Sequence, residues 1–324
     1  MIMLKRGLSC CALVVLLAIS LCSRVWAAPS VVDVSTLQCE IKDSAPRCDD
    51  KIQFDMGYEQ ELREGRCRYR SLEGLPVGDR WFDRCVDGFI GAYAQVCLVG
   101  QMGRLGCGAI NHSGEIVIPL VYDRIEITPH SAIVAVNYNG KWGFFNLDED
   151  RLLLAPQFSR ITSFSEGLAY VETETEDITE PGWIINEQGL RVASVPRKIQ
   201  VAGRFSDGLA PARSDTLWGY INSKGEWAIS PQFYYAGEFS SGYATVLAID
   251  KPQQWAIIDV SGAGALFFEG DQHRVGEVVG SAVAVTFDCE SEPAVATSVR
   301  CKRMCLELSN PEPKAACTKV LETR

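Results

Sequence analysis

The chain has 324 residues, of which 47% are hydrophobic, and a formal net charge of -10 at neutral pH. This apolar content is enough to bury a core, which excludes an intrinsically disordered chain. The excess of acidic residues argues against nucleic-acid binding, because that activity needs a positive face to meet the phosphates.

The amino-terminal residues have the pattern of a secretory signal. Lys5 and Arg6 precede an apolar run, and Val25-Trp26-Ala27 provides a small-x-small cleavage pattern, so we predict a signal peptide over residues 1–27. A membrane anchor is the alternative, but the run falls short of the roughly 20 residues that span a bilayer, and we expect no transmembrane helix after signal removal. Removal takes away three basic residues and no acidic one, so the net charge falls to -13. The expected location is the periplasm or cell envelope, with secretion as the alternative.

Thirteen cysteines become ten after signal removal, and these form two groups near the ends of the chain. An even number in an exported protein predicts disulfides, whose connectivity the sequence leaves open. Four late thiolates could instead bind zinc, but only Cys301 and Cys305 are closely spaced, so we expect no metal and no cofactor. We expect a Cys-rich segment over residues 28–85 and a Cys-rich tail over 286–324. The disulfide candidates are Cys39, Cys48, Cys67, Cys85, Cys97, Cys107, Cys289, Cys301, Cys305 and Cys317.

Between these segments a pattern recurs five times: an apolar strand ends in Asn or Asp, and in four of the five copies a glycine follows three residues later. The Asn/Asp column is spaced by 35, 40, 36 and 37 residues, and the second copy has Glu149 in place of the glycine. Such turns supply the left-handed conformations of a tight hairpin. The column consists of Asn111, Asn146, Asn186, Asn222 and Asp259.

Each copy continues with an apolar run, usually with a proline, and then a Phe-Ser-x-Gly segment in three of the copies. This predicts three short β-strands per unit, which bury their apolar faces only by stacking on neighbouring units. We therefore predict an all-β array of about five or six units over residues 86–285. An open, solenoid-like array is favoured because the outer units are degenerate, and a closed, propeller-like ring is the alternative.

Two copies carry a more specific pattern. Lys141-Trp142-Gly143-Phe144-Phe145-Asn146 and Leu217-Trp218-Gly219-Tyr220-Ile221-Asn222 are each followed by Pro-Gln-Phe and by Phe-Ser-x-Gly. They resemble the WG repeat of bacterial proteins, which implies a β-repeat scaffold without an assigned reaction. The other copies depart from it: they read Cys107-Gly108, Gly182-Trp183 and Trp255-Ala256.

No catalytic motif accompanies the repeat, and we nominate no catalytic, cofactor-binding or metal-binding residue. His112 is expected in a surface turn. The acidic stretch at residues 172–180 coincides with the longest spacing and is expected to be a solvated inserted loop, with calcium binding as the rival. Trp142, Trp218 and Trp255 could bind a ligand with their rings, but core packing is the favoured interpretation.

These observations favour a non-enzymatic binding or scaffold protein that presents its repeat surface to a protein or glycan. The alternative is an extracytoplasmic, hydrolase-like enzyme with its site in the Cys-rich ends.

Overall fold

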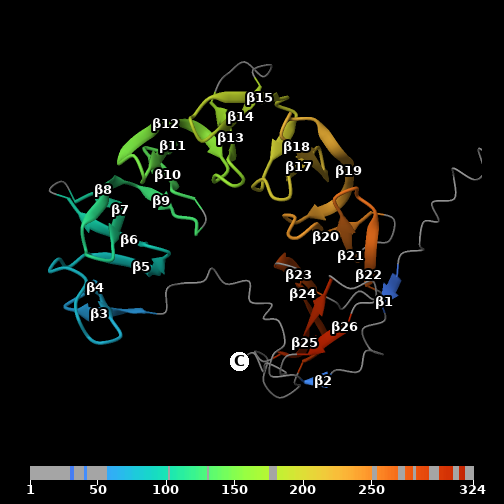
Figure 1. Ribbon diagram of the computed structural model, residues 1–324, viewed down its shortest axis with the longest axis horizontal. Helices are drawn as coiled ribbons and strands as arrows, with labels where there is room; N and C mark the ends of the chain where they lie inside the picture. The colour runs from blue at the N-terminus through green and yellow to red at the C-terminus, as the bar shows by residue number, and fades with distance from the viewer. Residues whose placement is uncertain are drawn as a thin grey trace, which may run out of the picture.

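The computed structural model describes residues 30–32, 40–41, 57–100, 103–129, 131–174, 181–249, 254–268, 274–279, 282–291, 299–308 and 314–317, and every regular element in these ranges is a β-strand. The strands form small antiparallel units that follow one another along an arc, from β3 (Tyr58–Arg63) and β4 (Arg66–Ser71) at the lower left of Figure 1, over the top, to the carboxy-terminal strands at the lower right. The predicted all-β repeat array is confirmed.

Each unit contains the three predicted strands and a short fourth strand that precedes them. Unit 1 is β5 (Arg84–Ile90), β6 (Tyr93–Val99), β7 (Leu105–Asn111) and β8 (Ile116–Tyr122). Unit 2 is β9 (Arg124–Glu126), β10 (Ile133–Tyr138), β11 (Lys141–Asn146) and the first part of β12 (Arg151–Ile161); unit 3 is the rest of β12 with β13 (Leu168–Thr173), β14 (Gly182–Asn186) and β15 (Arg191–Val195). Unit 4 is β16 (Ile199–Val201), β17 (Leu209–Ser214), β18 (Leu217–Asn222) and the first part of β19 (Trp227–Ala236). Unit 5 is the rest of β19 with β20 (Tyr243–Ala248), β21 (Trp255–Asp259) and β22 (Gly264–Phe268), and unit 6 is β23 (Arg274–Val279), β24 (Ala282–Ser291), β25 (Val299–Glu307) and β26 (Lys314–Cys317).

Two long strands each serve two units. Phe158 of β12 pairs with Trp142 of unit 2 and also with Thr173 of unit 3. Phe233 of β19 occupies the same position between units 4 and 5. These are the phenylalanines of the Pro-Gln-Phe pattern, and both are buried. In units 3 and 5 the fourth strand is therefore the continuation of the preceding unit's outer strand.

The Asn/Asp column forms the turn that leads into each outer strand. In every copy the side-chain Oδ1 accepts backbone N–H groups from two residues that follow it: Ser113 and Glu115, Asp148 and Glu149, Gln188 and Leu190, Lys224 and Glu226, and Ser261 and Ala263. A short carboxamide or carboxylate side chain is the group that can make this turn. The recurrence of Asn or Asp is thus explained by backbone hydrogen bonding.

The turn of unit 2 lacks the glycine because it is one residue longer. Phe145 pairs with Leu152, seven residues on, whereas Ile185 and Ile221 pair with Arg191 and Trp227, six residues on. The left-handed conformation moves to Asp150, whose φ is 48°. Aspartate tolerates this region better than most residues.

The glycine of the Trp-Gly pair is required by a close backbone approach. The pairing of the outer strand shifts opposite Gly143 and opposite Gly219, at the positions of Pro156 and Pro231. A Cβ atom on either glycine would lie 2.4 Å from a carbonyl oxygen of that bulged strand. Gly108 of unit 1 meets the same constraint opposite Pro119, with 2.2 Å to the Ile118 oxygen.

Units 3 and 5 have neither this glycine nor this bulge. Trp183 pairs regularly with Ser194, and Ala256 pairs regularly with Phe267. A side chain at this position is therefore tolerated where the outer strand is regular. The departures from the Trp-Gly pattern follow the geometry of the facing strand.

The Phe-Ser-x-Gly segments are two-residue hairpins that also connect neighbouring units. The x residue and the glycine both have positive φ, between 51° and 85°, which is the type I′ turn of a tight hairpin. The Glu166 carboxylate accepts N–H groups from Asp207 and Gly208 of the next unit, and the Asp207 carboxylate accepts the Gly242 N–H of the unit after that. Each acidic turn thus orients the following turn.

A hairpin caps the amino-terminal end of the array. It consists of β3 (Tyr58–Arg63) and β4 (Arg66–Ser71). Tyr69 and Phe82 are buried against unit 1, while Arg68–Glu61 and Arg70–Glu59 form ion pairs of 2.7 Å across the strands. An apolar inner face and a charged outer face are what the end of a repeat array requires.

Two short strands near the amino terminus join the far end of the array. β1 (Ser30–Val32) pairs in parallel with β22, and β2 (Glu40–Ile41) pairs in parallel with β26. No sheet of the described strands contains strands from both ends of the arc.

Substitution of Gly219 by alanine tests the close approach. Gly219→Ala is expected to lower the free energy of unfolding by about 1–3 kcal/mol, because the added methyl group displaces the bulged strand. Urea denaturation of the purified protein measures the loss. Ala256→Gly is the matched change in unit 5 and should cost no more than about 1 kcal/mol. A Gly219→Ala protein as stable as the parent would contradict the explanation.

Candidate functional site

The three tryptophans nominated from the sequence lie at the boundaries between units. Trp142 packs against the core between units 2 and 3, Trp218 against that between units 4 and 5, and Trp255 against that between units 5 and 6. All three are half-buried. Their packing accounts for their presence in the repeat, and ligand binding by their outer edges stays a prediction.

Neighbouring rings and cations brace the tryptophans. Tyr235 lies between Trp218 and Trp255, with ring-centroid distances of 6.4 and 5.6 Å and steep interplanar angles. The guanidinium of Arg213 lies 5.9 Å from the Trp218 ring centroid. Edge-to-face geometry stabilises aromatic packing, but it does not form a flat platform for a ligand.

In units 1 and 3 another group occupies the position of the tryptophan. Cys107 of unit 1 forms a disulfide with Cys97 on the neighbouring strand, and both are buried. Unit 3 has Gly182 there, and a Cβ atom at Gly182 would lie 2.1 Å from the hydroxyl oxygen of Tyr170. The glycine therefore makes room for the tyrosine.

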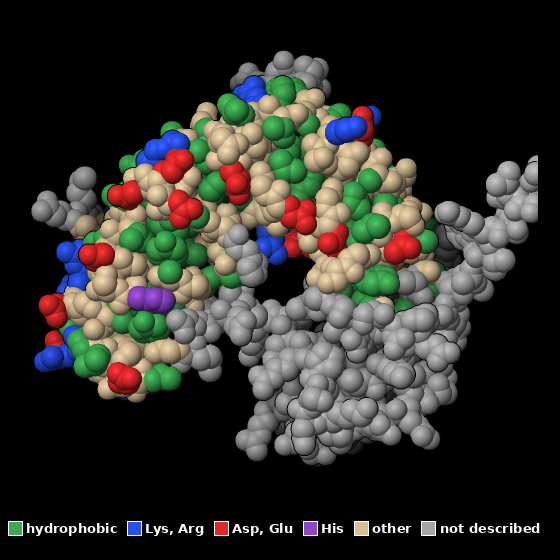
Figure 2. All heavy atoms as spheres, viewed as in Figure 1, with side chains coloured by type: hydrophobic (Ala, Val, Ile, Leu, Met, Phe, Trp, Pro, Cys, Tyr) green, Lys and Arg blue, Asp and Glu red, His purple; other side chains and the backbone are tan. Residues whose placement is uncertain are grey.

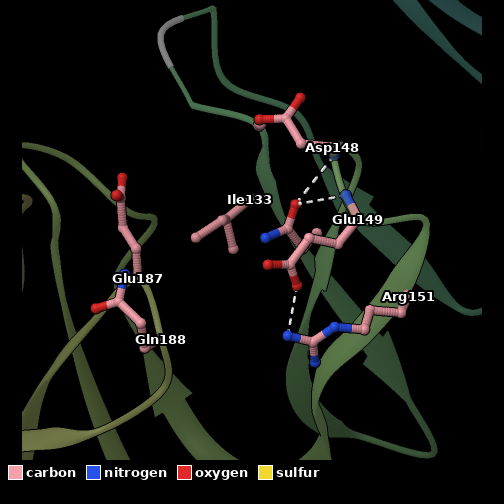
Figure 3. Close-up of a pocket in the computed structure, with 8 residues that line it drawn as sticks. Ile133, Asp148, Glu149, Arg151, Glu187 and Gln188 are labelled. Carbon is pink, nitrogen blue, oxygen red and sulfur yellow. Dashed lines mark hydrogen bonds and ion pairs between the residues drawn. The ribbon is translucent and has the colours of Figure 1, made fainter.

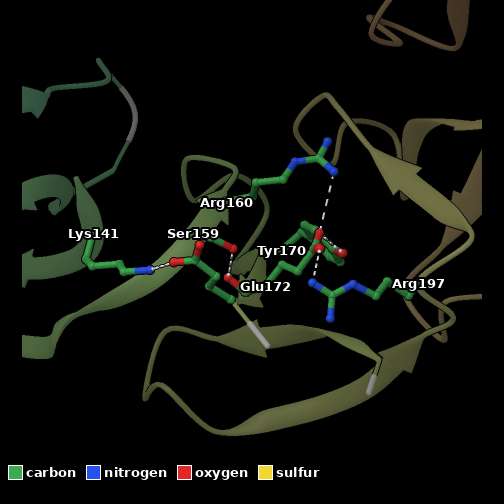
Figure 4. A network of polar contacts seen from close by, with 7 residues as sticks. Lys141, Ser159, Arg160, Tyr170, Glu172 and Arg197 are labelled. Carbon is green, nitrogen blue, oxygen red and sulfur yellow. Dashed lines mark hydrogen bonds and ion pairs between the residues drawn. The ribbon is translucent and has the colours of Figure 1, made fainter. Parts of the chain in front are cut away.

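Tyr170 belongs to a polar network between units 3 and 4 (Figure 4). Its hydroxyl donates to Oε2 of Glu172 at 3.0 Å. The two guanidiniums, Arg197 and Arg160, lie 3.3 and 3.5 Å from the Glu172 carboxylate. Ser159 Oγ donates to the Glu172 carbonyl oxygen at 3.0 Å. The carboxylate is 11% exposed and is held from three directions.

This network corrects one expectation. Glu172 was expected at the start of a solvated acidic loop, but it is buried at the end of β13. The alternating Glu and Thr residues of this stretch gave no sign that Glu172 is buried. The signal that could have indicated a different side chain at this boundary is Gly182, which stands at the position of the tryptophan in the Trp-Gly pair. Residues 175–180 of the acidic stretch lie outside the described residues.

Burial of its hydroxyl and the negative charge of Glu172 raise the pKa of Tyr170 well above its usual range. The neutral phenol is the form that donates to a carboxylate. The guanidiniums of Arg160 and Arg197 carry two positive charges against the single negative charge of Glu172. Because Arg160 is 44% exposed, the network leaves a partly exposed positive site. The arrangement braces the boundary, and nothing in its geometry positions a nucleophile.

A small polar cavity of about 210 Å³ lies between the turns of units 2 and 3 (Figure 3). Glu187 and Gln188 form one wall and Asp148 and Glu149 the other, with buried Ile133 between them. Glu149 is paired with Arg151.

Across the face in Figure 2, charges of both signs are interleaved along the arc, without a single positive patch.

The disulfide candidates are partly placed. Cys67 bonds to Cys85 and thereby links the cap to unit 1, and Cys97 bonds to Cys107 within unit 1. Cys39 and Cys48 lie outside the described residues, as do the side chains of Cys289, Cys301, Cys305 and Cys317.

His112 lies in a turn as expected, where its ring stacks on Tyr58 at 4.7 Å.

The decisive comparison is with the family model of the WG-containing repeat, which matches residues 108–142, 142–174 and 218–247. The chain contains WG repeats. The matched ranges contain both complete Trp-Gly copies, and the structure extends the same architecture to units that have lost the pattern.

Solved structures show the fold of this WG-repeat protein at low identity. A eukaryotic initiation factor is 9% identical over 81% of this chain and 74% of its own, with a TM-score of 0.54. Two further structures have lower TM-scores. Hsv2p of Kluyveromyces lactis is 9% identical over 82% of this chain and 95% of its own, with a TM-score of 0.40. PorZ of the Porphyromonas gingivalis type-IX secretion system is 9% identical over 83% of this chain and 38% of its own, with a TM-score of 0.35. No curated protein sequence matches the chain. Among the described residues no helix is long and apolar enough to cross a bilayer.

Removal of the Tyr170 hydroxyl tests the network. Tyr170→Phe is expected to lower the free energy of unfolding by about 1–3 kcal/mol at neutral pH, because a hydrogen bond to a charged group is lost. The raised pKa means that the folded state holds this proton more tightly, so this contribution is lost as pH rises above the unfolded value near 10. The two proteins should therefore converge in stability above that pH. Denaturation at several pH values measures the difference.

Tyr138→Phe is the control, because Tyr138 is an exposed tyrosine on the hairpin of unit 2. A gap between the parent and Tyr170→Phe that stays constant up to pH 11 would contradict the assignment, since ionisation of a phenol near its unfolded pKa of about 10 must enter the balance.

Proposed function

We propose that this WG-repeat protein is a non-enzymatic binding or scaffold protein of the periplasm or cell envelope, which presents the surface of its repeat array to a protein or glycan partner. The observation that carries the proposal is that the polar side chains which recur from unit to unit make hydrogen bonds within the array. The Asn/Asp column makes turns, and Glu166 and Asp207 orient the turns of neighbouring units. Their recurrence is therefore explained by the construction of the scaffold.

The arc of four-stranded units supports a binding role on physical grounds. Such units form an extended surface whose shape depends on contacts between neighbours and not on individual surface residues. Arg204 and Glu238 reinforce one such boundary with a 2.8 Å ion pair. A partner can therefore be accommodated by surface substitutions that leave the framework unchanged.

The proposed location follows from the amino-terminal signal pattern and is compatible with the disulfides. An oxidising compartment forms such bridges and the cytosol does not maintain them. The cap is held to unit 1 by Cys67 and Cys85, so oxidation would contribute to the integrity of the array.

Cell fractionation tests the location. The mature chain is expected in the periplasmic fraction with Ala28 as its first residue, and non-reducing peptide mapping should find Cys67 joined to Cys85 and Cys97 joined to Cys107. The sequencing and mapping use the same purified sample. A chain that retains Met1, or one that carries these four thiols free, would contradict export.

A photo-reactive amino acid introduced at exposed positions tests the binding role. Leu62, Leu190, Tyr234 and Val260 are between 47% and 75% exposed and are distributed from the cap to unit 5. Irradiation in cells is expected to give a discrete adduct from a subset of these positions, because a partner covers a limited surface. Buried Phe144, which cannot reach a partner, is the control. Absence of an adduct at every exposed position would contradict the proposal.

A further inference from the structure

The outer strands of the units are of two kinds. In units 1, 2 and 4 the outer strand carries a proline and a bulge, at Pro119, Pro156 and Pro231. Both features obstruct the addition of a further strand, because proline lacks an N–H group and a bulge breaks the ladder. These three edges are protected.

In units 5 and 6 the outer strands are plain, which here means that they have neither proline nor that bulge. They are β22 and β26. Each is covered by a parallel strand from the amino-terminal part of the chain. β1 pairs Ser30 with Leu266 and Val32 with Phe268, and β2 pairs with β26 in the same parallel sense. The chain therefore adds a strand at both of these plain edges.

Unit 3 has the remaining plain outer strand, β15. It contains no proline, it pairs regularly opposite Trp183, and it is the end strand of its seven-stranded sheet among the described residues. Leu190, which ends the turn before β15, is 63% exposed, and Val192 of β15 is 49% exposed. Figure 2 shows hydrophobic side chains at the top of the arc, where Figure 1 draws β15.

An exposed plain edge with apolar side chains is a template for strand addition. We propose that β15 is a docking edge for an extended segment of a partner protein, which adds as a parallel strand and places apolar or β-branched side chains beside Leu190 and Val192. Ser30-Val31-Val32 on β22 shows the chemistry of such a segment. This inference rests on the proposed binding role and assigns a partner class and a place to it.

The inference also explains why an internal unit departs from the Trp-Gly pattern. A glycine at the position of Trp183 would permit the bulged outer strand seen in units 1, 2 and 4. Unit 3 has instead Gly182 for Tyr170, and the network of Glu172 and Arg197 fills the boundary without that bulge. The register shift that β15 does have, between Ile184 and Ile185, matches the shift of β22 between Ile257 and Ile258, and β22 still pairs with β1. The edge of β15 therefore remains able to pair.

The test uses the mature full-length protein and a fluorescent peptide with the sequence of residues 28–36, which contains the strand that adds to β22. Anisotropy measures its affinity, and hydrogen–deuterium exchange locates its site. The peptide is expected to slow exchange at β15. Leu190→Lys/Val192→Lys should weaken binding by roughly tenfold or more, because charges on an edge oppose pairing.

The matched control is Ile116→Lys/Leu152→Lys, which places the same charges at positions 39% and 37% exposed on protected outer strands. It should change affinity by no more than about twofold. A peptide N-methylated at alternate residues keeps its side chains but loses the backbone donors, and it should not bind.

Three results would overturn the inference: no binding to the parent protein, equal weakening by both pairs of substitutions, or protection at β22 alone. Self-association that Leu190→Lys/Val192→Lys abolishes would assign the edge to a second copy of the chain and overturn the partner segment. Photo-adducts at other positions but none at Leu190 would leave the binding role standing and remove this docking edge, so the two failures are distinguishable.

Discussion

The structure depends on the close approach of a bulged outer strand to the strand that carries Trp-Gly. Gly143 and Gly219 permit an approach that any side chain would block, and the proline at each bulge supplies no N–H group to the ladder. Beyond the bulge, Phe158 and Phe233 carry the strand into the next unit. The same few residues therefore shape one unit and begin the following one, which is why the motif recurs as a set.

Once the outer strand connects two units in this way, different side chains can pack at the boundary between them. Trp142 and Trp218 fill it with aromatic surface, and Tyr170 with a hydrogen-bonded ionic network. In unit 1 the tryptophan's position is taken by Cys107, which forms a disulfide within the unit. Buried ionic groups are not in general more stabilising than apolar packing. The network in unit 3 is therefore better explained by what it leaves at the outer edge, a strand without the proline and bulge of units 1, 2 and 4, than by a gain in stability.

The sequence predicted the features that local chemistry determines. The Asn/Asp column, the hairpins of Phe-Ser-x-Gly and the three strands of each unit were evident, because turn residues and alternating apolar residues signal them directly. The fourth strand of units 3 and 5 was not evident, since it is the end of the preceding unit's outer strand and has no turn of its own before Phe158 or Phe233. Glu172 was mistaken for a loop residue because its partners, Arg160 and Arg197, come from separate strands and turns that only the fold brings together.

The central claim is that outer strands with neither the proline nor the bulge opposite the Trp-Gly position remain able to pair, whereas outer strands that have both do not. Amide hydrogen exchange tests it most directly. In a protein that contains residues 30–32 the amides of β22, covered by β1, should exchange more slowly than those of β15, and a chain that begins at Asp33 should lose this difference. Equal protection of the two strands in the intact protein, or protection of β22 that survives the truncation, would contradict the account.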